Sequence, residues 1–494
     1  MGRPGADLVP HLVHQARPAR FLTMHTVTTP PLAAATRPRP ATVTPHWAHA
    51  LVHRLHTWVG LLIGPFLLIA ALTGAAYVVT PQIEALVYQQ ALTTASTGPS
   101  LPLEQLIETA RTHTGHALPL SGVRPAPAPG DTTRVMFNDP ALGEGERRAI
   151  FLDPVTGAVL GDHAVYGTSG ALPVRIWTSK LHRQLRLGEA GRLYSELAAS
   201  WLWLAALGGL WMWCQRKRQP RPAPNARRPL RDRHGQLGLW LLAGMLFLSV
   251  SGLTWSRYAG EHIGQWRKAW GWGTPSLATA LPGPAAASDS ASGTPRSGTP
   301  AAHGHHHEAP PAHPAVTGST NFDRVLQVAR AHGIDAGKVE IRPPAAAHKA
   351  WTVTEIDRRW PTQVDAVAVD GETLAVVDHL RFADFPLAAQ LTRWAVDLHM
   401  GVMFGLPNQL VLATVALGLV ALVGWGYAMW WRRRALSHRE PTLWQALGLA
   451  PWPARLAVLG LAVGLGLALP VLGVSLAVFL ALDGVVSLRP SLRR

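Results

Sequence analysis

Four histidines stand at matching places in two halves of the sequence, and imidazole is a side chain that binds metals or shuttles protons. Two of them begin apolar stretches and are each followed by a glycine 18 residues later. The other two precede apolar stretches that end in Gly-x-x-Met-Trp. The equivalent positions are His56 with His234, His182 with His399, Gly74 with Gly252, Gly209 with Gly426, Met212 with Met429 and Trp213 with Trp430. The sequence therefore contains an internal duplication.

The duplication predicts two pairs of facing histidines, because equivalent helices run in the same direction. His56 and His234 would meet at one membrane face, and His182 and His399 at the other. Ionisable groups within a membrane usually face the bundle interior with a partner. One imidazole on each side of a haem iron explains single histidines on separate, symmetry-related helices. We therefore predict two haem sites, with His53 as an alternative to His56; the competing interpretation is interfacial histidines bonded to headgroups or loops.

The elements that carry these histidines are predicted to be membrane-spanning helices. Of the 494 residues, 48% are hydrophobic and 15% are charged, and the apolar residues gather in blocks. A hydrocarbon core of about 30 Å needs about 20 apolar residues. Four blocks have that length, at 58–80, 196–214, 236–256 and 408–431. A fifth block, 456–488, carries Pro470 near its middle, so we predict an all-α transmembrane bundle of four core spans plus a C-terminal apolar hairpin.

The distribution of charge predicts the orientation in the membrane. The formal net charge is +16, but Lys and Arg crowd the loop 215–233 and the end of the fourth span at Arg432–Arg434. By the positive-inside rule these segments and the N-terminus are cytoplasmic. The basic residues thus indicate a lipid bilayer rather than nucleic acid as the partner. We predict a multi-pass membrane protein whose two long loops face outward.

The two long loops are predicted to form two small α+β domains. In each loop a helix-like pattern is followed by strand-like patterns with a turn between them. These patterns lie at 103–115, 134–138 and 148–162 in the first loop, and at 321–334, 351–356 and 363–378 in the second. No nucleophile, general base or phosphate-binding loop is visible in either. Binding or scaffolding is therefore the expected role.

Two segments are predicted not to fold. Residues 1–45 are rich in Pro, Ala, Thr and Arg, and the insert 280–318 is rich in Pro, Ala, Ser and Gly, compositions that bury too little apolar surface to fold. The histidines of the insert could collect a transition metal weakly, and the alternative is a solvated linker. They are His303, His305, His306, His307 and His313.

The order of the predicted segments follows from these patterns. The parts outside the spans are the cytoplasmic tail 1–45, the first outer domain 82–180, the basic loop 215–233, the second outer domain 257–395 and the cytoplasmic loop 432–453. The membrane parts are span 1 in 46–80, span 2 with its preceding interfacial segment in 181–214, span 3 in 234–256, span 4 in 396–431 and the hairpin in 454–488.

The sequence resembles the PepSY-associated transmembrane proteins over about residues 46–488. The resemblance rests on Arg-Leu-His-x-Trp-x-Gly at 54–60, on the Leu-Thr-Gly that ends at Gly74, and on Leu-His before the second and fourth spans. It also rests on Gly-Leu-Pro-Asn-Gln at 405–409 and on the interposed helix-and-strand domains, which the resemblance implies to be PepSY-like. The tail and the His-rich insert depart from the family pattern.

The resemblance implies a function in iron uptake. Family members studied for function look like inner-membrane reductases that carry two b-type haems and reduce ferric siderophores in the periplasm. This implies two haem b groups, an oxidoreductase activity and a ferric siderophore, or another Fe(III) chelate, as the substrate. Because no Gly-x-Gly-x-x-Gly fingerprint follows a strand, we expect the electron to come from a separate cytoplasmic or quinol donor.

Two other functions compete with this interpretation. One is a non-redox membrane anchor whose outer domains bind or regulate a periplasmic peptidase or sensor; the four histidines would then be dispensable and the purified protein colourless. The other is a transporter for a metal or siderophore. It is disfavoured because Glu84 and Asp483 lie at span ends and no carboxylate lies in the middle of a span.

Overall fold

The computed structural model describes residues 47–217, 229–281, 322–433 and 441–488. Several sequence predictions fall outside the described residues. These are the tail 1–45, the central part of the basic loop and nearly all of the His-rich insert, including His305, His306 and His307.

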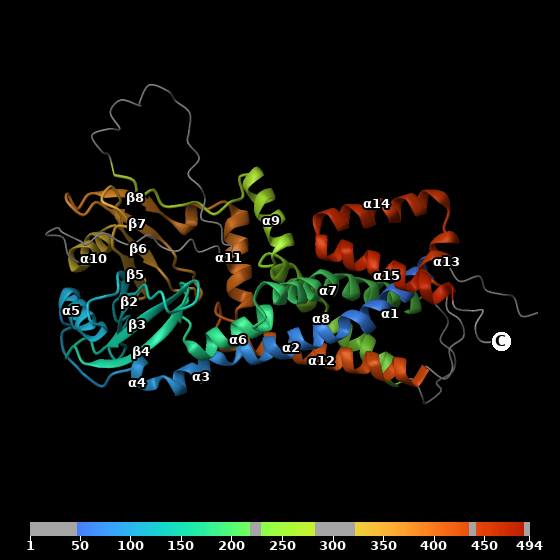
Figure 1. Ribbon diagram of the computed structural model, residues 1–494, viewed down its shortest axis with the longest axis horizontal. Helices are drawn as coiled ribbons and strands as arrows, with labels where there is room; N and C mark the ends of the chain where they lie inside the picture. The colour runs from blue at the N-terminus through green and yellow to red at the C-terminus, as the bar shows by residue number, and fades with distance from the viewer. Residues whose placement is uncertain (1–46, 218–228, 282–321, 434–440, 489–494) are drawn as a thin grey trace, which may run out of the picture. The chain divides into compact units, whose positions relative to one another are not determined.

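Four helices are long and apolar enough to cross a membrane, which confirms the four predicted spans. They are Trp47–Val78, Gly188–Arg216, Leu230–Leu253 and Leu406–Arg433. The first consists of α1 (Trp47–Trp58), the π-helical turn η1 (Val59–Ile63) and α2 (Gly64–Val78), and the others belong to α7 (Gly188–Lys217), α8 (Pro229–Leu253) and α12 (Leu406–Arg433). α7 packs against α8, α8 against α12, α12 against α2 and α2 against α7, so the four spans close into a bundle (Figure 1). Each helix begins earlier than its apolar block because the polar approach to the membrane is helical too.

The π-helical turn in the first span has an identifiable cause. Pro65, at the start of α2, has no N–H and cannot bond to the carbonyl of Leu61. The Tyr427 hydroxyl, from α12, donates to that carbonyl at 2.7 Å instead. The neighbouring span therefore satisfies the backbone group that the proline leaves free, and such turns are frequent at functional sites.

Both segments between the spans contribute to one antiparallel sheet with the strand order β4-β3-β2-β1-β5-β6-β7-β8 (Figure 1). The first segment supplies β1 (Leu120–Arg124), β2 (Thr133–Phe137), β3 (Glu146–Leu152) and β4 (Val159–Tyr166), and the second supplies β5 (Val339–Arg342), β6 (Trp351–Glu355), β7 (Ala366–Val369) and β8 (Val376–Leu380). Val123 on β1 lies opposite Ile341 on β5. The prediction of two separate small sheets is thus corrected, because β1 and β5, which the sequence patterns missed, join them.

Two helices on one face of the sheet cap each other. α5 (Leu103–Thr114) and α10 (Phe322–Ala331) pack on the same apolar core as the strands. Asp323 of α10 accepts a hydrogen bond from the Leu103 N–H at 2.9 Å, and Glu104 of α5 accepts one from the Phe322 N–H at 2.9 Å. Carboxylates are favourable at helix N-termini. Each helix therefore caps the N-terminus of the other, and these two hydrogen bonds link the first repeat to the second.

A buried ion cluster lies beside the strand pair that joins the repeats. Glu340 on β5 is 2% exposed and forms ion pairs with Arg124 on β1, Arg147 on β3 and Arg342 on its own strand. Burial alone would raise the pKa of the Glu340 carboxyl, but the guanidiniums of Arg342, Arg124 and Arg147 hold that pKa well below its ordinary value. Glu340 is therefore ionised, and its charge links the first repeat to the second.

Short helices connect the spans to the sheet. They are α3 (Thr80–Val87), α4 (Gln89–Leu92), α6 (Pro173–Gln184), α9 (Tyr258–Ala269), the 3-10 turn η3 (Phe382–Asp384) and α11 (Leu387–His399). Glu84 on α3 accepts hydrogen bonds from the N–H groups of Leu172 and Arg175 at 2.8 and 3.1 Å, which caps the N-terminus of α6. α6 also packs against α2. These contacts fix the end of the bundle that adjoins the sheet, called the sheet end below.

The C-terminal apolar block forms a helical hairpin. α13 (Leu443–Gly448) precedes α14 (Trp452–Ala468) and α15 (Pro470–Leu488), and the chain turns just before Pro470. α15 packs against α7, where the Trp201 indole donates to the Ser475 hydroxyl at 2.8 Å. Asp483 is fully buried and pairs with Arg54 of α1 at 3.0 Å. Both helices are shorter than the four spans.

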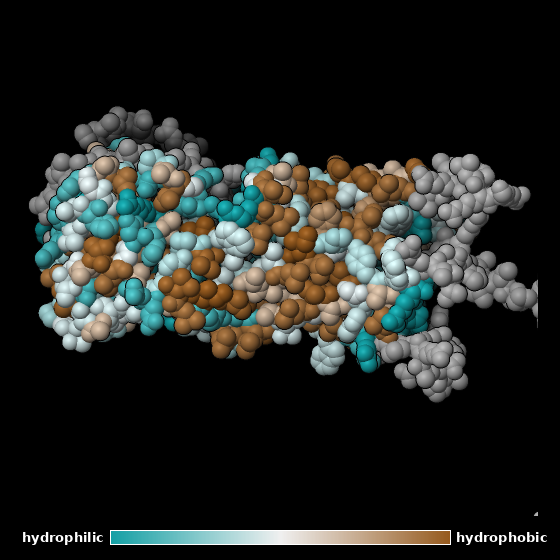
Figure 2. Space-filling view, turned by 60° about the horizontal axis from the view of Figure 1, so that its bottom comes forward, coloured by the Kyte–Doolittle hydropathy of each residue, from teal (hydrophilic) through white to brown (hydrophobic). Residues whose placement is uncertain are grey.

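The outer surface of the helices is apolar. Figure 2 shows hydrophobic side chains gathered over the helical part and hydrophilic ones over the sheet. Large exposed apolar side chains on these helices include Leu72, Trp240, Val250, Leu410, Val411, Leu417, Leu461, Val463 and Val474. Such a continuous apolar surface is suited to lipid rather than to water.

Candidate functional site

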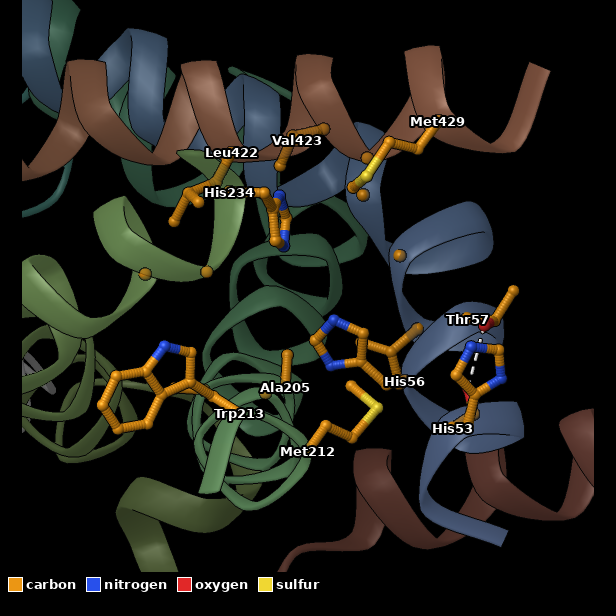
Figure 3. A pocket seen from close by; sticks show the side chains of 18 of the residues that line it. His53, His56, Thr57, Ala205, Met212, Trp213, His234, Leu422, Val423 and Met429 are labelled. Carbon is orange, nitrogen blue, oxygen red and sulfur yellow. Dashed lines mark hydrogen bonds between the residues drawn. The ribbon is translucent and has the colours of Figure 1, made fainter. Parts of the chain in front are cut away.

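A cavity of about 1220 Å³ lies inside the bundle, and α1, α7, α8 and α12 all contribute to its wall (Figure 3). Ligand pockets usually measure about 300–1,000 Å³, so this one has room for a large cofactor. The duplicated residues converge on it: it is lined by His56, His234, Gly209, Gly426, Met212, Met429, Trp213 and Trp430. The spacing that the two halves share therefore builds one cavity from both repeats.

His56 and His234 point toward one another in this cavity (Figure 3). Their ring centroids are 6.4 Å apart and the ring planes meet at 89°. A ring nitrogen lies about 2.0–2.1 Å from a bound first-row metal and about 1.1 Å from its ring centroid, so two imidazoles on opposite sides of one metal have centroids about 6.3 Å apart. The observed separation thus fits a metal between the two rings.

Both imidazoles are half-buried, and Nδ1 of each is buried and short of partners. Nδ1 of His56 and Nδ1 of His234 make no hydrogen bond within the described residues, although the carbonyls of Ala205 and Leu422 lie beside the two rings. Gly209 is adjacent as well: a Cβ on it would lie 3.4 Å from Cε1 of His56. The glycine of the repeated exit motif therefore lets α7 approach the imidazole closely.

His53 lines the same cavity from one turn earlier on α1. Its ring stacks with that of His49 at a centroid distance of 6.1 Å. His56, rather than His53, is the histidine that lies opposite His234. Of the two alternatives for the first helix, the geometry thus favours His56.

His182 and His399 lie together at the sheet end of the bundle. They sit on α6 and α11, the short helices that precede the second and fourth spans, and not on the span helices themselves. Burial, and then the charge of Arg183, lower the pKa of His182 to about 4. Burial, and then His182, lower the pKa of His399 to about 4. Both rings are therefore neutral near pH 7, the form in which imidazole binds metals.

A hydroxyl group orients each of these two rings. The Thr73 hydroxyl donates to a carbonyl one turn earlier in α2 at 2.7 Å, so its oxygen is left to accept from Nδ1 of His182 at 3.1 Å. In the same way the Ser251 hydroxyl donates within α8 at 2.6 Å and accepts from Nδ1 of His399 at 2.7 Å. The hydrogen bonds assign the ring proton to Nδ1 in both cases. Nε2 of each ring keeps its lone pair for a ligand.

A glycine follows each hydroxyl residue and lies beside the ring. A Cβ on Gly74 would lie 3.2 Å from Cε1 of His182, and one on Gly252 would lie 4.0 Å from Cε1 of His399. The tight contact at Gly74 leaves little space for any side chain. The hydroxyl thus orients the imidazole in both repeats, and at Gly74 the absence of a side chain also makes room for it.

Each of the two sites offers two imidazoles and few other ligands. Within the described residues there is no group of three or more His, Cys, Asp or Glu side chains that could hold a metal ion by itself. Two imidazoles, one from each repeat, would hold a haem group at either site, and a haem would supply one-electron redox chemistry there.

The family model of the PepSY-associated TM region matches residues 53–433. The chain belongs to the PepSY-associated TM region family. The matched segment contains most of the first span, the other three spans, all eight strands and the four duplicated histidines of this PepSY-associated protein. The match confirms the resemblance drawn from the sequence motifs. Among curated proteins, no relative matches the chain.

Sequence reasoning missed Thr73 and Ser251 in this PepSY-associated chain. A signal was present: the two residues stand at equivalent places in the duplication, directly before Gly74 and Gly252. Hydroxyl residues in apolar helices usually bond to their own helix, and Thr73 and Ser251 do so here. Each hydroxyl oxygen also accepts a hydrogen bond from a histidine on another helix. That second bond cannot be predicted from the sequence of one helix alone.

Proposed function

We propose that this protein is a two-haem electron conduit that reduces Fe(III), carried by a siderophore or a related chelate, in iron uptake. The observation that carries the proposal is the 6.4 Å separation of the His56 and His234 rings inside a cavity of about 1220 Å³. Haem supplies one-electron redox chemistry when it is bound. In this proposal His56 and His234 hold one haem b, and His182 and His399 hold the second.

The spacing of the two histidine pairs supports a path across the membrane. Gly74, which contacts His182, follows His56 by 18 residues, and a helix of that length rises about 27 Å. This is close to the thickness of the hydrocarbon core, about 30 Å. One pair thus belongs near each membrane face, and the positive-inside rule assigns the cavity to the cytoplasmic face.

The chain's own residues orient the rings and restrict water. Thr73 and Ser251 leave Nε2 of His182 and His399 available. Apolar side chains from several helices line the cavity, among them Leu67, Leu202, Met245 and Leu419. An apolar shell controls solvent access and thereby the redox potential of a bound metal. The electron donor is a separate cytoplasmic or quinol donor, and the acceptor is an Fe(III) chelate on the sheet side.

An absorption spectrum of the detergent-purified protein, before and after dithionite, tests the haem assignment. We expect b-type bands and two haems per chain in a pyridine haemochrome assay. Protein expressed with adequate haem supply that remained colourless would contradict the proposal and favour the non-redox anchor.

Stopped-flow mixing of the reduced protein with ferric siderophores and other Fe(III) chelates tests the acceptor. The haem absorbance should report oxidation, and the rate should fall to background in His399→Ala protein. Equal rates with and without the second histidine pair would contradict the reductase function while leaving the haem assignment intact.

A further inference from the structure

Four arginines gather at the sheet end of the bundle, near the second histidine pair. They come from three parts of the chain, namely α6, the segment after β6 and α11. We call them the arginine cluster: Arg175, Arg183, Arg358 and Arg393.

Electrostatic contacts show that these arginines form one group. The guanidiniums of Arg175, Arg358 and Arg183 all act on the phenol of Tyr77, near the end of α2. Burial, and then the charge of Arg358, lower the pKa of Arg393 to about 10. Charges that influence a shared neighbour, or one another, in this way lie close together.

The cluster carries more positive than negative charge. Arg175 pairs with Glu84 at 2.7 Å, and Asp397 is shared by two arginines, Arg358 at 2.5 Å and Arg393 at 3.3 Å. Arg183 has no ion pair in the part of the chain that the structure describes, and its guanidinium lies over the Tyr166 ring at 5.6 Å. The four guanidiniums thus face only two carboxylates. The cluster therefore has a net charge of +2, which two further carboxylates would neutralise.

The arginine cluster also has unused hydrogen-bond donors. Nε of Arg175, of Arg183 and of Arg358 is buried and makes no hydrogen bond within the described segments, and the same holds for Nε1 of Trp394, whereas Nε of Arg393 lies 3.3 Å from a carboxylate oxygen of Asp397. Buried donors without acceptors are costly, and in native proteins nearly all of them have a partner. A bound anion with several acceptor oxygens would satisfy them.

The cluster adjoins the second histidine pair. Arg183 follows His182 in the chain, and its charge acts on that imidazole. Asp397, which holds two of the arginines, stands two residues before His399 on α11. Tyr77 lies one helical turn beyond Gly74, the residue in contact with His182. The arginine cluster therefore lies next to the second histidine pair.

We propose that the arginine cluster is a carboxylate-binding site for a ligand with two carboxylates. Guanidinium groups bind carboxylates through paired, charge-assisted hydrogen bonds, and Arg does so better than Lys. Two sources share this chemistry: the two carboxylate arms of a porphyrin at the second site, which rests on the proposed function, or a polycarboxylate chelate that enters from the sheet side. The position beside the rings favours the porphyrin arms.

A titration can separate the two sources. The His234→Ala protein, prepared without haem, retains only the second histidine pair and is titrated with iron protoporphyrin IX and with its dimethyl ester, followed by absorbance. Arg183→Gln should weaken binding of the diacid about tenfold or more and leave the ester unchanged, since only the diacid offers charged acceptors. Arg183→Lys should retain part of the affinity. The matched control is Arg186→Gln, three residues away, whose guanidinium lies over Trp177 at 5.7 Å and outside the cluster.

Citrate provides the second arm of the experiment. If Arg183→Gln weakens citrate binding and leaves both porphyrins unaffected, the site serves a free polycarboxylate. If neither the diacid nor citrate responds to Arg183→Gln, the cluster is not a carboxylate site and the inference is overturned. If no porphyrin binds at all, the proposed function fails, and the citrate titration of Arg183→Gln against Arg186→Gln still decides on the cluster.

Discussion

The rings of His56, on α1, and His234, on α8, face each other with their centroids 6.4 Å apart and their planes nearly perpendicular. Nδ1 of neither ring has a hydrogen-bond partner among the described residues, whereas His182 and His399 each donate to a hydroxyl oxygen. A hydrogen bond from Nδ1–H makes the imidazole a stronger electron donor to a metal. The two histidine pairs of one duplicated protein therefore provide different environments.

The two histidine pairs should be separable by mutation. We expect His234→Ala to remove one haem and His399→Ala to remove the other, because the pairs lie at opposite ends of the spans. Haem content and spectra of each purified variant test this. His53→Ala is the control and should retain both haems, since His53 does not face His234; loss of haem from His53→Ala together with retention in His56→Ala would assign the ligand to His53.

Removing the hydroxyl partners should change the redox potential of the second site. In Thr73→Val and Ser251→Ala protein, Nδ1–H loses its acceptor, so the imidazole donates less to Fe(III). We expect the midpoint potential of that haem to rise by up to about 60 mV, the equivalent of a tenfold change in relative affinity for the two iron oxidation states. Redox titration of the haem bands measures it.

Thr392→Val is the matched control for these hydroxyl variants. The Thr392 hydroxyl bonds to its own helix, α11, at 2.6 Å, and has no hydrogen bond to an imidazole. An equal shift in Thr392→Val and Thr73→Val protein would mean that the Thr73 hydroxyl does not act through His182.

A side chain at Gly74 should displace His182. Because a Cβ there would already lie 3.2 Å from Cε1 of the ring, Gly74→Val forces the imidazole away from its position. We expect loss of the second haem with retention of the first, measured by haem content. Gly424→Val, where a Cβ meets nothing within 4 Å, is the control and should keep both; retention of both haems in Gly74→Val would contradict the assigned position of His182.

Glu340→Gln should destabilise the joined sheet. The substitution leaves three arginines around a neutral amide, and breaking a buried ion pair in this way costs about 3–5 kcal/mol. Thermal unfolding of the detergent-solubilised protein, followed by far-UV circular dichroism in the strand region, measures the loss. Asp384→Asn, which breaks an exposed pair with Arg381, should cost less than about 1 kcal/mol.

The same carboxyl predicts a pH dependence. The folded-state pKa of Glu340 is depressed, so its stabilising contribution is fully present above the ordinary pKa of a glutamate and is lost as pH falls through the lower folded-state value. The stability difference between the wild-type protein and Glu340→Gln should therefore stay constant between pH 8 and pH 5. A difference that vanished within this window would contradict the depressed pKa.

The sequence by itself determined the membrane class, the four spans and the duplication, and it predicted the four paired histidines. Each is a local property: a span is read from about 20 consecutive apolar residues, and a repeat from equal spacing along the chain. His56 and His234 could be paired without coordinates because equivalent helices of a duplicated unit run the same way. The helices and most strands of the outer segments were readable from periodicity for the same reason.

Only the tertiary structure decided how the two halves meet. The contact of Val123 with Ile341 joins short strands far apart in the chain, whose few residues carry no pattern strong enough to predict their pairing. The choice of His56 over His53 depends on which side of α1 faces α8. The hydrogen bond from His182 to Thr73 and the arginine cluster likewise unite residues from separate helices, and such contacts depend on packing rather than on local sequence.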